Sequence, residues 1–205
     1  MKRANVGSDE HSDRDPKKVK MLNPADQRRI SPVDFVFNTF RKNNIDTARI
    51  IADSNKKFSE PTPEMINAYN LETTKAVREN DLIKLKNLHK SGVHLHCCNK
   101  FGDSLVHLAC RRGLTNTVKF LVEEAKVSVY VRDDLQRTPL HDACWTSKPN
   151  FEIVDTLIRV APDLTLLPDR RGDTPFAYVR RAHWEPWVEF LRNRFSKLRS
   201  NRKPK

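Results

Sequence analysis

Apolar positions in the second half of the chain recur with a period of 34 to 36 residues. A segment that begins with Ser or Thr and continues with mostly apolar residues occurs at 104–110, at 138–144 and, more loosely, at 174–179. A second apolar string follows each of these segments, near residues 118–122, 153–158 and 187–191. Apolar residues three and four positions apart are typical of amphipathic helices. The pattern therefore predicts pairs of helices that repeat along the chain.

Each predicted helical pair begins at a capping residue and contains a small side chain that lets its two helices pack closely. Thr138 and Thr174 can cap the first helix of their pairs, and the proline that follows fits a first turn whose amides have no acceptor within the helix. Ala109 and Ala143 are small, so they allow antiparallel helices to approach closely. One pair cannot bury its apolar stripe alone, so neighbouring pairs must stack, and at least about 3 are needed for stability.

Two stretches match a known repeat signature. Residues 138–143 read T-P-L-H-D-A, against a signature T-P-L-H-x-A, and residues 92–104 follow the linker of the same repeat with several substitutions. A degenerate first unit begins upstream, where Ala76 corresponds to Ala109. On these residues the chain resembles an ankyrin-repeat protein. The resemblance implies an all-α ankyrin-repeat solenoid of stacked helix-turn-helix units, with four repeats at 67–99, 100–133, 134–169 and 170–199.

The last unit and one turn depart from the signature. Ala177 stands in place of histidine and Val179 in place of alanine, and terminal repeats are commonly atypical because one face meets solvent. We therefore expect residues 170–199 to close the C-terminal end of the stack. Gln136 replaces the glycine expected in the linker of the middle unit, which predicts a different turn there.

Residues 30–66, upstream of the repeats, are predicted to form an N-terminal helical cap. Ser31 followed by Pro32 is typical of a helix start, and Thr62–Pro63 offers a second one. Apolar residues follow the first start along one helical face, at Val33, Val36, Phe37 and Phe40. We expect this first helix to cover the first end of the stack.

The net charge of +12 belongs mainly to the two ends of the chain. Residues 1–29 contribute +3 and residues 192–205 contribute +7, which leaves +2 for the rest. Residues 1–29 are polar, rich in opposed charges and almost without aromatic side chains, so we predict a disordered tail there and a basic tail at 200–205. A basic tail could attract nucleic acid, but the body carries no such signature.

Candidate catalytic and metal-binding chemistry is weak. His94, His96 and Cys98 could point the same way in a hairpin, but three ligands on a repeat linker lack the spaced Cys/His pairs of zinc sites, so we predict no metal. The resemblance implies a structural role for His107 and His141 in the hydrogen bonds at the helix starts. No phosphate-binding loop or nucleophile motif occurs, so we predict no cofactor and no enzymatic activity.

The resemblance implies a concave groove, lined by linker tips and first helices, in which the family binds protein partners. Trp, Tyr and Arg are frequent binding anchors. Repeat phase gives these candidate partner-binding residues: Leu108, Arg111, Arg112, Asp142, Trp145, Thr146, Tyr178 and Arg181. An alternative for Trp145 is packing against the inserted loop at Pro149. We predict a monomeric adaptor, scaffold or inhibitor; the alternative is a nucleic-acid-associated protein that uses its basic C-terminal tail.

Location is predicted from the N-terminal segment and the cysteines. Lys17, Lys18 and Lys20 resemble a short nuclear localisation signal, a pattern with many false matches. The start of the chain lacks the apolar centre of a secretory signal, and four cysteines without such a signal favour reduced thiols. We expect an intracellular protein of the nucleus, the cytoplasm or both, with no membrane span.

Overall fold

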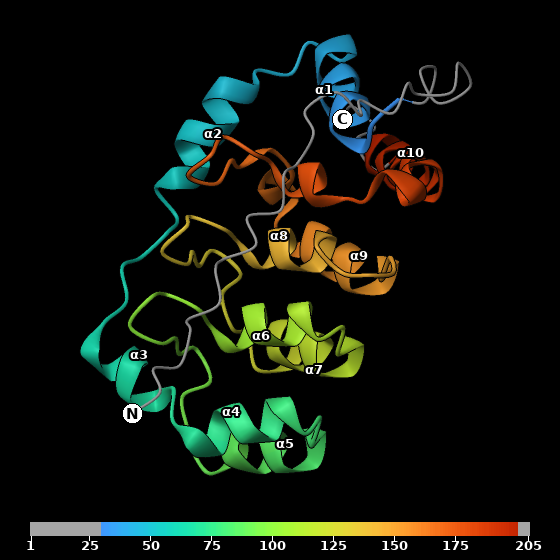
Figure 1. The fold of residues 1–205 in the computed structure, drawn as a ribbon. Helices are drawn as coiled ribbons and strands as arrows, with labels where there is room; N and C mark the ends of the chain where they lie inside the picture. Colours follow the sequence, from blue (N-terminus) through green and yellow to red (C-terminus); the bar gives the residue numbers. More distant parts are fainter. Residues whose placement is uncertain (1–29, 201–205) are drawn as a thin grey trace, which may run out of the picture.

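The computed structural model describes residues 30–200, and within that range the chain is helical apart from its connecting loops and one isolated bridge between residues 98 and 104 (Figure 1). The elements in chain order are α1 Pro32–Lys42, α2 Thr47–Asn55, α3 Pro63–Ala68, α4 Leu71–Arg78, α5 Leu82–Lys90, α6 Leu105–Arg111, α7 Thr115–Lys119, η2 Phe120–Glu124, α8 Pro139–Cys144, α9 Phe151–Val160, η3 Pro162–Leu166, η4 Pro175–Tyr178, η5 Arg181–His183 and α10 Trp184–Ser200.

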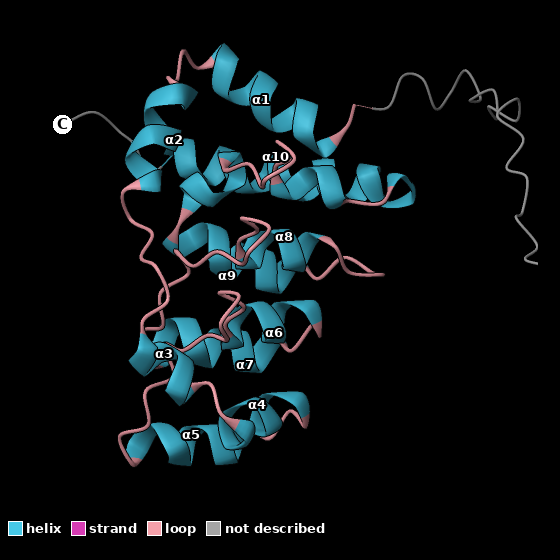
Figure 2. Cartoon of the chain, turned by 60° about the vertical axis from the view of Figure 1, so that its left-hand side comes forward, coloured by secondary structure: helices cyan, strands magenta, loops and turns pink. Residues whose placement is uncertain are grey.

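Four helical units stack on one another along the molecule (Figures 1 and 2). Unit 1 is α4 with α5, unit 2 is α6 with α7 and η2, unit 3 is α8 with α9, and unit 4 is η4 with η5 and α10. The first helices contact one another from unit to unit, α4 with α6, α6 with α8 and α8 with η4, and α7 contacts α9. The predicted all-α solenoid of stacked helical pairs is confirmed.

The loop that joins each unit to the next projects to one side of the helices, and we call these loops fingers 1, 2 and 3: residues 91–104, 125–138 and 161–174 (Figure 1). Each of the first two fingers ends in a capping box. Ser104 and Thr138 pair with the backbone amide of the histidine three residues later, and that histidine's Nδ1 accepts a hydrogen bond from the cap residue's own amide. These reciprocal bonds satisfy amides at the helix start that have no partner inside the helix.

The same histidines also hold the next finger. Nε2 of His107 bonds the carbonyl oxygen of Arg137 at 3.0 Å, and Nε2 of His141 bonds that of Asp173 at 3.1 Å. One ring therefore fixes a helix start in its own unit and the base of the following finger. This finding agrees with the structural role that the resemblance implied for both residues.

Unit 4 differs from the others in its first helix. At the histidine position stands Ala177, which has no ring to complete a capping box, and Thr174 makes no side-chain cap. The first helix is reduced to the short 3-10 turn η4. Its missing surface is replaced by aromatic packing, because buried Trp187 contacts Phe151 of unit 3 at a centroid distance of 5.1 Å and Phe176 at 5.8 Å.

The N-terminal helix α1 covers the last unit, not the first. Its contacts are with α10 and η4, and Phe195 of α10 lies 6.5 Å from the Phe35 ring and 5.9 Å from the Phe40 ring (Figure 1). The helix starts at Ser31 and at Thr62 are as predicted. The predicted position of the cap is wrong, because an apolar helix face does not specify which end of a stack it covers.

From α2 the chain runs back along the stack to unit 1, on the far side of the fingers from α6 and α8 (Figure 2). We call residues 43–70 the strap. Its middle is anchored on half-buried Asp163 of η3, which accepts hydrogen bonds from Lys57 at 2.8 Å, Ser54 at 2.5 Å and Tyr130 at 2.7 Å. Burial works to raise the pKa of Asp163, but these bonds outweigh it and hold that pKa below its usual value. Cys98 of finger 1 donates its amide to the carbonyl of Met65, which fixes the far end of the strap.

Finger tips use a left-handed backbone at equivalent positions. The φ angles of Gly102, Gln136 and Gly172 are +77°, +62° and +88°. Gln136 therefore adopts the same type of turn as the glycines, and the prediction of a different turn is wrong. The difference between the glycines lies in their surroundings: a Cβ on Gly102 would lie 2.1 Å from the carbonyl oxygen of Arg132 in finger 2, whereas nothing lies within 4 Å of one on Gly172.

This contrast predicts unequal costs for the same substitution. Both Gly102→Ala and Gly172→Ala place a side chain at positive φ, which costs about 1–2 kcal/mol. Only Gly102→Ala also drives a methyl group into the backbone of the neighbouring finger, so we expect its free energy of unfolding to fall by about 2 kcal/mol more. Chemical denaturation of the two variants measures the difference, and equal losses would contradict the close packing of fingers 1 and 2.

The position of α1 predicts an energetic coupling between residues 155 positions apart in the sequence. Phe40→Ala and Phe195→Ala should each destabilise the protein, and the double variant should lose about 1 kcal/mol less than the sum, because each single change already removes the ring contact. Phe195→Ala combined with Phe101→Ala, whose ring lies on finger 1, serves as the additive control. A cycle without coupling would mean that α1 does not rest on α10 in solution.

Candidate functional site

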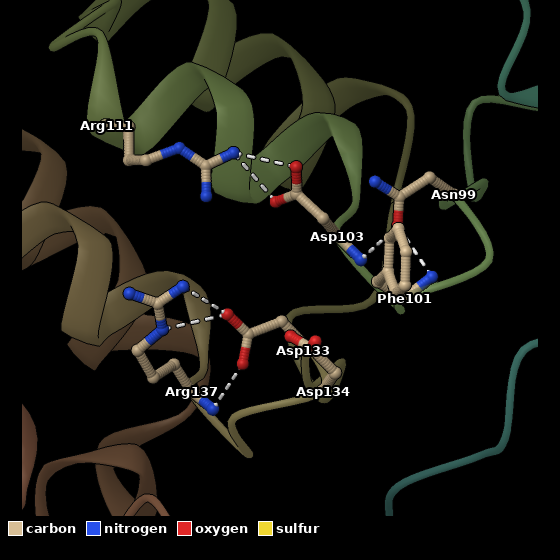
Figure 3. A pocket seen from close by; sticks show the side chains of 7 residues that line it. All are labelled: Asn99, Phe101, Asp103, Arg111, Asp133, Asp134 and Arg137. Carbon is tan, nitrogen blue, oxygen red and sulfur yellow. Dashed lines mark hydrogen bonds and ion pairs between the residues drawn. The ribbon is translucent and has the colours of Figure 1, made fainter. Parts of the chain in front are cut away.

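A hollow of about 360 Å³ lies between fingers 1 and 2, in front of α6 (Figure 3). Side chains from both fingers and from the end of α6 line it: Asn99, Phe101, Asp103, Arg111, Asp133, Asp134 and Arg137. Phe101 is 52% exposed at the tip of finger 1, and Leu135 is 39% exposed at the tip of finger 2. The fingers therefore present apolar side chains next to a charged hollow.

Arg111 joins units 2 and 3 at the back of this hollow. Its Nη2 donates to both carboxylate oxygens of Asp103 at 2.8 Å, and its Nη1 donates to Oδ2 of Asp142 at 2.9 Å. Asp142 is only 1% exposed. Burial raises the pKa of Asp142 to about 7, although the nearby positive charge of Arg111 acts to lower that pKa. The guanidinium group is engaged on both sides, so its role here is to connect the two units.

Arg137 and Trp145 extend the lined surface to unit 4. Arg137 donates from Nε and Nη2 to one carboxylate oxygen of Asp133, at 2.8 and 2.6 Å, and its guanidinium lies 5.6 Å from the Trp145 ring centroid. Trp145 also meets the ring of Tyr178 at 6.0 Å, and the hydroxyl of Tyr178 donates to Asp169 at 2.5 Å. Trp145 remains 54% exposed, so two neighbours hold its ring while about half of it faces solvent.

Two of the predicted partner-binding residues are buried, and the other six are exposed or half-buried. Leu108 and Asp142 are buried and offer no surface to a partner, so their assignment as contact residues is corrected. Arg112 is exposed and donates to the carbonyl of Arg78 at 3.1 Å, and Thr146 is half-buried. Arg181 is half-buried with its guanidinium 5.4 Å from the Trp184 ring. We give the name groove surface to Phe101 and Leu135 of the finger tips together with the predicted residues Arg112, Trp145, Thr146 and Tyr178.

Phe101 and Leu135 were missed by the sequence analysis. They lie 34 residues apart, both directly before the left-handed residue of a finger tip, and Arg171 takes the same place in finger 3. The repeat phase could therefore have identified them. The predicted residues came instead from the first helices of the units, such as Leu108 and Asp142. Both are buried by packing between units, which the sequence phase does not specify.

Most groups considered for catalysis or metal binding are buried or half-buried, and His94 is exposed. All four cysteines are buried and unpaired, and burial raises the pKa of Cys110 and of Cys144 well above the usual value. Such thiols are poor nucleophiles. Within residues 30–200, no group of three His, Cys, Asp or Glu side chains is arranged to hold a metal ion. Lys17, Lys18 and Lys20 of the predicted localisation signal lie outside the described residues.

Comparison with known proteins agrees with this architecture. Residues 74–167 match the family model of ankyrin repeats, in three copies. These residues are ankyrin repeats. Ankyrin repeats generally mediate protein–protein interaction, and the family is typically non-catalytic. The match covers units 1 to 3 and ends before unit 4. No curated protein matches the chain significantly. No helix among residues 30–200 has the length and apolar character to cross a membrane.

The buried histidines predict an acid-sensitive fold. Burial lowers the pKa of His107 and lowers that of His141 to about 4, from an ordinary value of 6.5. Between pH 6.5 and 4 the unfolded chain binds more protons at His141, so its contribution to stability is complete above pH 6.5 and falls as the pH drops toward 4. Asp142, with its raised pKa, acts in the opposite sense and contributes most below its ordinary pKa of 3.8.

We expect His141→Gln to reduce the loss of unfolding free energy between pH 7 and pH 5 by about 1–2 kcal/mol, even though the variant is less stable at both values. Urea denaturation at the two pH values measures this difference, and His94→Gln, at an exposed position of finger 1, serves as the control. An unchanged difference in the His141 variant would show that this ring is not held neutral in the folded protein.

Proposed function

We propose that the protein is a non-catalytic binding module, acting as an adaptor, scaffold or inhibitor, that holds a partner protein on the groove surface. The observation that carries this proposal is Trp145, a large aromatic side chain that is held in place by Tyr178 and Arg137 yet half exposed. A side chain held in advance loses little conformational freedom when it binds, and tryptophan is a frequent binding anchor.

The neighbours of Trp145 support the same proposal. Phe101 and Leu135 add exposed apolar area on the finger tips, and Arg112 adds an exposed charge at the end of α6. Apolar side chains rimmed by polar groups are typical of protein interaction sites. The ring of Trp145 contacts Tyr178 of the groove surface and Arg137 of the adjoining hollow, which favours a role in binding over packing against the loop at Pro149.

The rival proposal, nucleic-acid binding through the basic C-terminal tail, gains little from the described residues. Arg192 lies over the Phe35 ring at 5.9 Å, and Arg194 pairs with Asp155 at 2.8 Å. These two basic residues therefore contribute to the contacts of α10 within the fold. We propose that the chain acts as a monomer inside the cell, in the nucleus or cytoplasm, and four buried thiols without disulfides support a reducing compartment.

The proposal is tested with the double variant Trp145→Ala and Arg112→Ala. We expect proteins that co-purify with the wild-type chain from cells to be lost, because the variant removes the central anchor and an exposed charge of the groove surface. Both side chains are exposed, so the melting temperature should fall by only about 2–4 °C.

Ile83→Ala serves as the matched control. Ile83 is an apolar side chain that is 75% exposed on α5 of unit 1, away from the groove surface. Its loss should leave the recovered partners unchanged. Recovery of the same partners by the double variant and by the wild type would defeat the proposal.

A further inference from the structure

Unit 4 and the finger before it carry arginine side chains that form no ion pair within the described residues. Arg170 and Arg171 are exposed at the tip of finger 3, and Arg180 is exposed directly before η5. None of these three guanidinium groups forms an ion pair within the described part of the chain. Two acidic residues flank Arg170 and Arg171: Asp169, whose carboxylate is bonded to Tyr178 and to backbone amides of the tip, and exposed Asp173.

These arginines differ in this respect from the arginines of the neighbouring hollow. Arg111 is neutralised by Asp103 and Asp142, and Arg137 by Asp133. The hollow between fingers 1 and 2 also carries the exposed carboxylate of Asp134. The charges of Arg111 and Arg137 are therefore neutralised by carboxylates of the fold, whereas the guanidinium groups of Arg170, Arg171 and Arg180 at unit 4 have no ion pair within residues 30–200.

Backbone and side-chain contacts tie the basic end to the aromatic anchor. The amide of Arg170 donates to the carbonyl of Leu135 at 2.9 Å, so the tip of finger 3 rests on the tip of finger 2. Tyr178 bonds Asp169 at the base of finger 3 and meets the ring of Trp145. The half-exposed aromatic pair thus lies at the foot of the finger that carries Arg170 and Arg171.

We propose that the partner presents a linear acidic segment to this surface, with Asp or Glu side chains facing Arg170, Arg171 and Arg180 and an apolar or aromatic side chain on Trp145 and Tyr178. Exposed guanidinium groups without internal partners bind carboxylates in a two-pronged geometry at a low desolvation cost. They also accelerate the approach of an acidic partner and exclude a basic one. This inference rests on the proposed function and specifies the chemistry of the partner.

The experiment selects binders from a library of random twelve-residue peptides displayed on phage, using the immobilised full chain and discarding peptides that also bind the Trp145→Ala variant. We expect the enriched peptides to combine two or more acidic residues with an aromatic or large apolar residue. The affinity of one enriched peptide, measured by fluorescence anisotropy, should fall at least tenfold for the Arg171→Glu and Arg180→Glu double variant.

The matched control is Arg41→Glu with Lys42→Glu, which changes the net charge equally on exposed positions of α1. It should leave the peptide affinity within about twofold. Enrichment of neutral or basic peptides, or an affinity that the arginine variant leaves unchanged, would overturn the acidic-segment inference while the groove remains a protein-binding site.

Two further outcomes are distinguishable. Failure to enrich any peptide that depends on Trp145 would overturn the groove proposal and this inference together. Binding of a twelve-nucleotide oligouridine that competes with the peptide and is lost in the Arg171→Glu and Arg180→Glu variant would assign these arginines to nucleic acid, and would overturn the inference in favour of the rival function.

Discussion

The structure depends on the inability of one short helical pair to bury its own apolar side. Helices of five to eleven residues, such as α7 and α1, are too short to be stable alone, and their apolar residues are buried only where another pair lies against them. Every unit therefore needs a neighbour, and the two ends of the stack pose a problem that the inner units do not have. At unit 4 the problem is solved twice, by the Trp187 aromatic cluster and by α1. At unit 1, Leu71 and Ile83 remain largely exposed.

The strap follows from the same constraint. Because α1 covers the last unit while the repeats begin at the other end, the chain has to run back along the whole stack before unit 1 can start. It does so on the side of the fingers away from α6 and α8, fixed by Asp163 and by the bond to Cys98 (Figure 2). Within residues 30–200, the strap does not cover the groove surface. It also connects the last unit to the first through one continuous segment.

Features with a local physical cause could be predicted from the sequence. The helix starts at Ser31, Thr62, Ser104 and Thr138 depend on the cap residue and the few residues after it, and the repeat period carries them along the chain. The position of α1 could not be predicted in this way, because its Phe35 and Phe40 would fit any apolar end. The turn at Gln136 was predicted wrongly for a related reason. Glycine is the usual residue at a left-handed turn of this repeat, but the surrounding finger imposes the same turn on glutamine.

The candidate site shows most clearly why residue type alone is insufficient. Arg111, Arg137 and Arg171 lie at or near finger positions and are chemically identical, yet the first two are bonded to carboxylates of the fold and the third has none in the described structure. Their positions in the repeat place all three near the groove. Only the structure distinguishes an arginine that connects two units from one whose guanidinium group is available to a partner. The same distinction removes Asp142 from the surface and leaves Trp145 on it, because burial is decided by the neighbouring unit. In the proposed function, recognition therefore depends on the side chains that stacking leaves exposed, apolar ones such as Trp145 as well as polar ones such as Arg171.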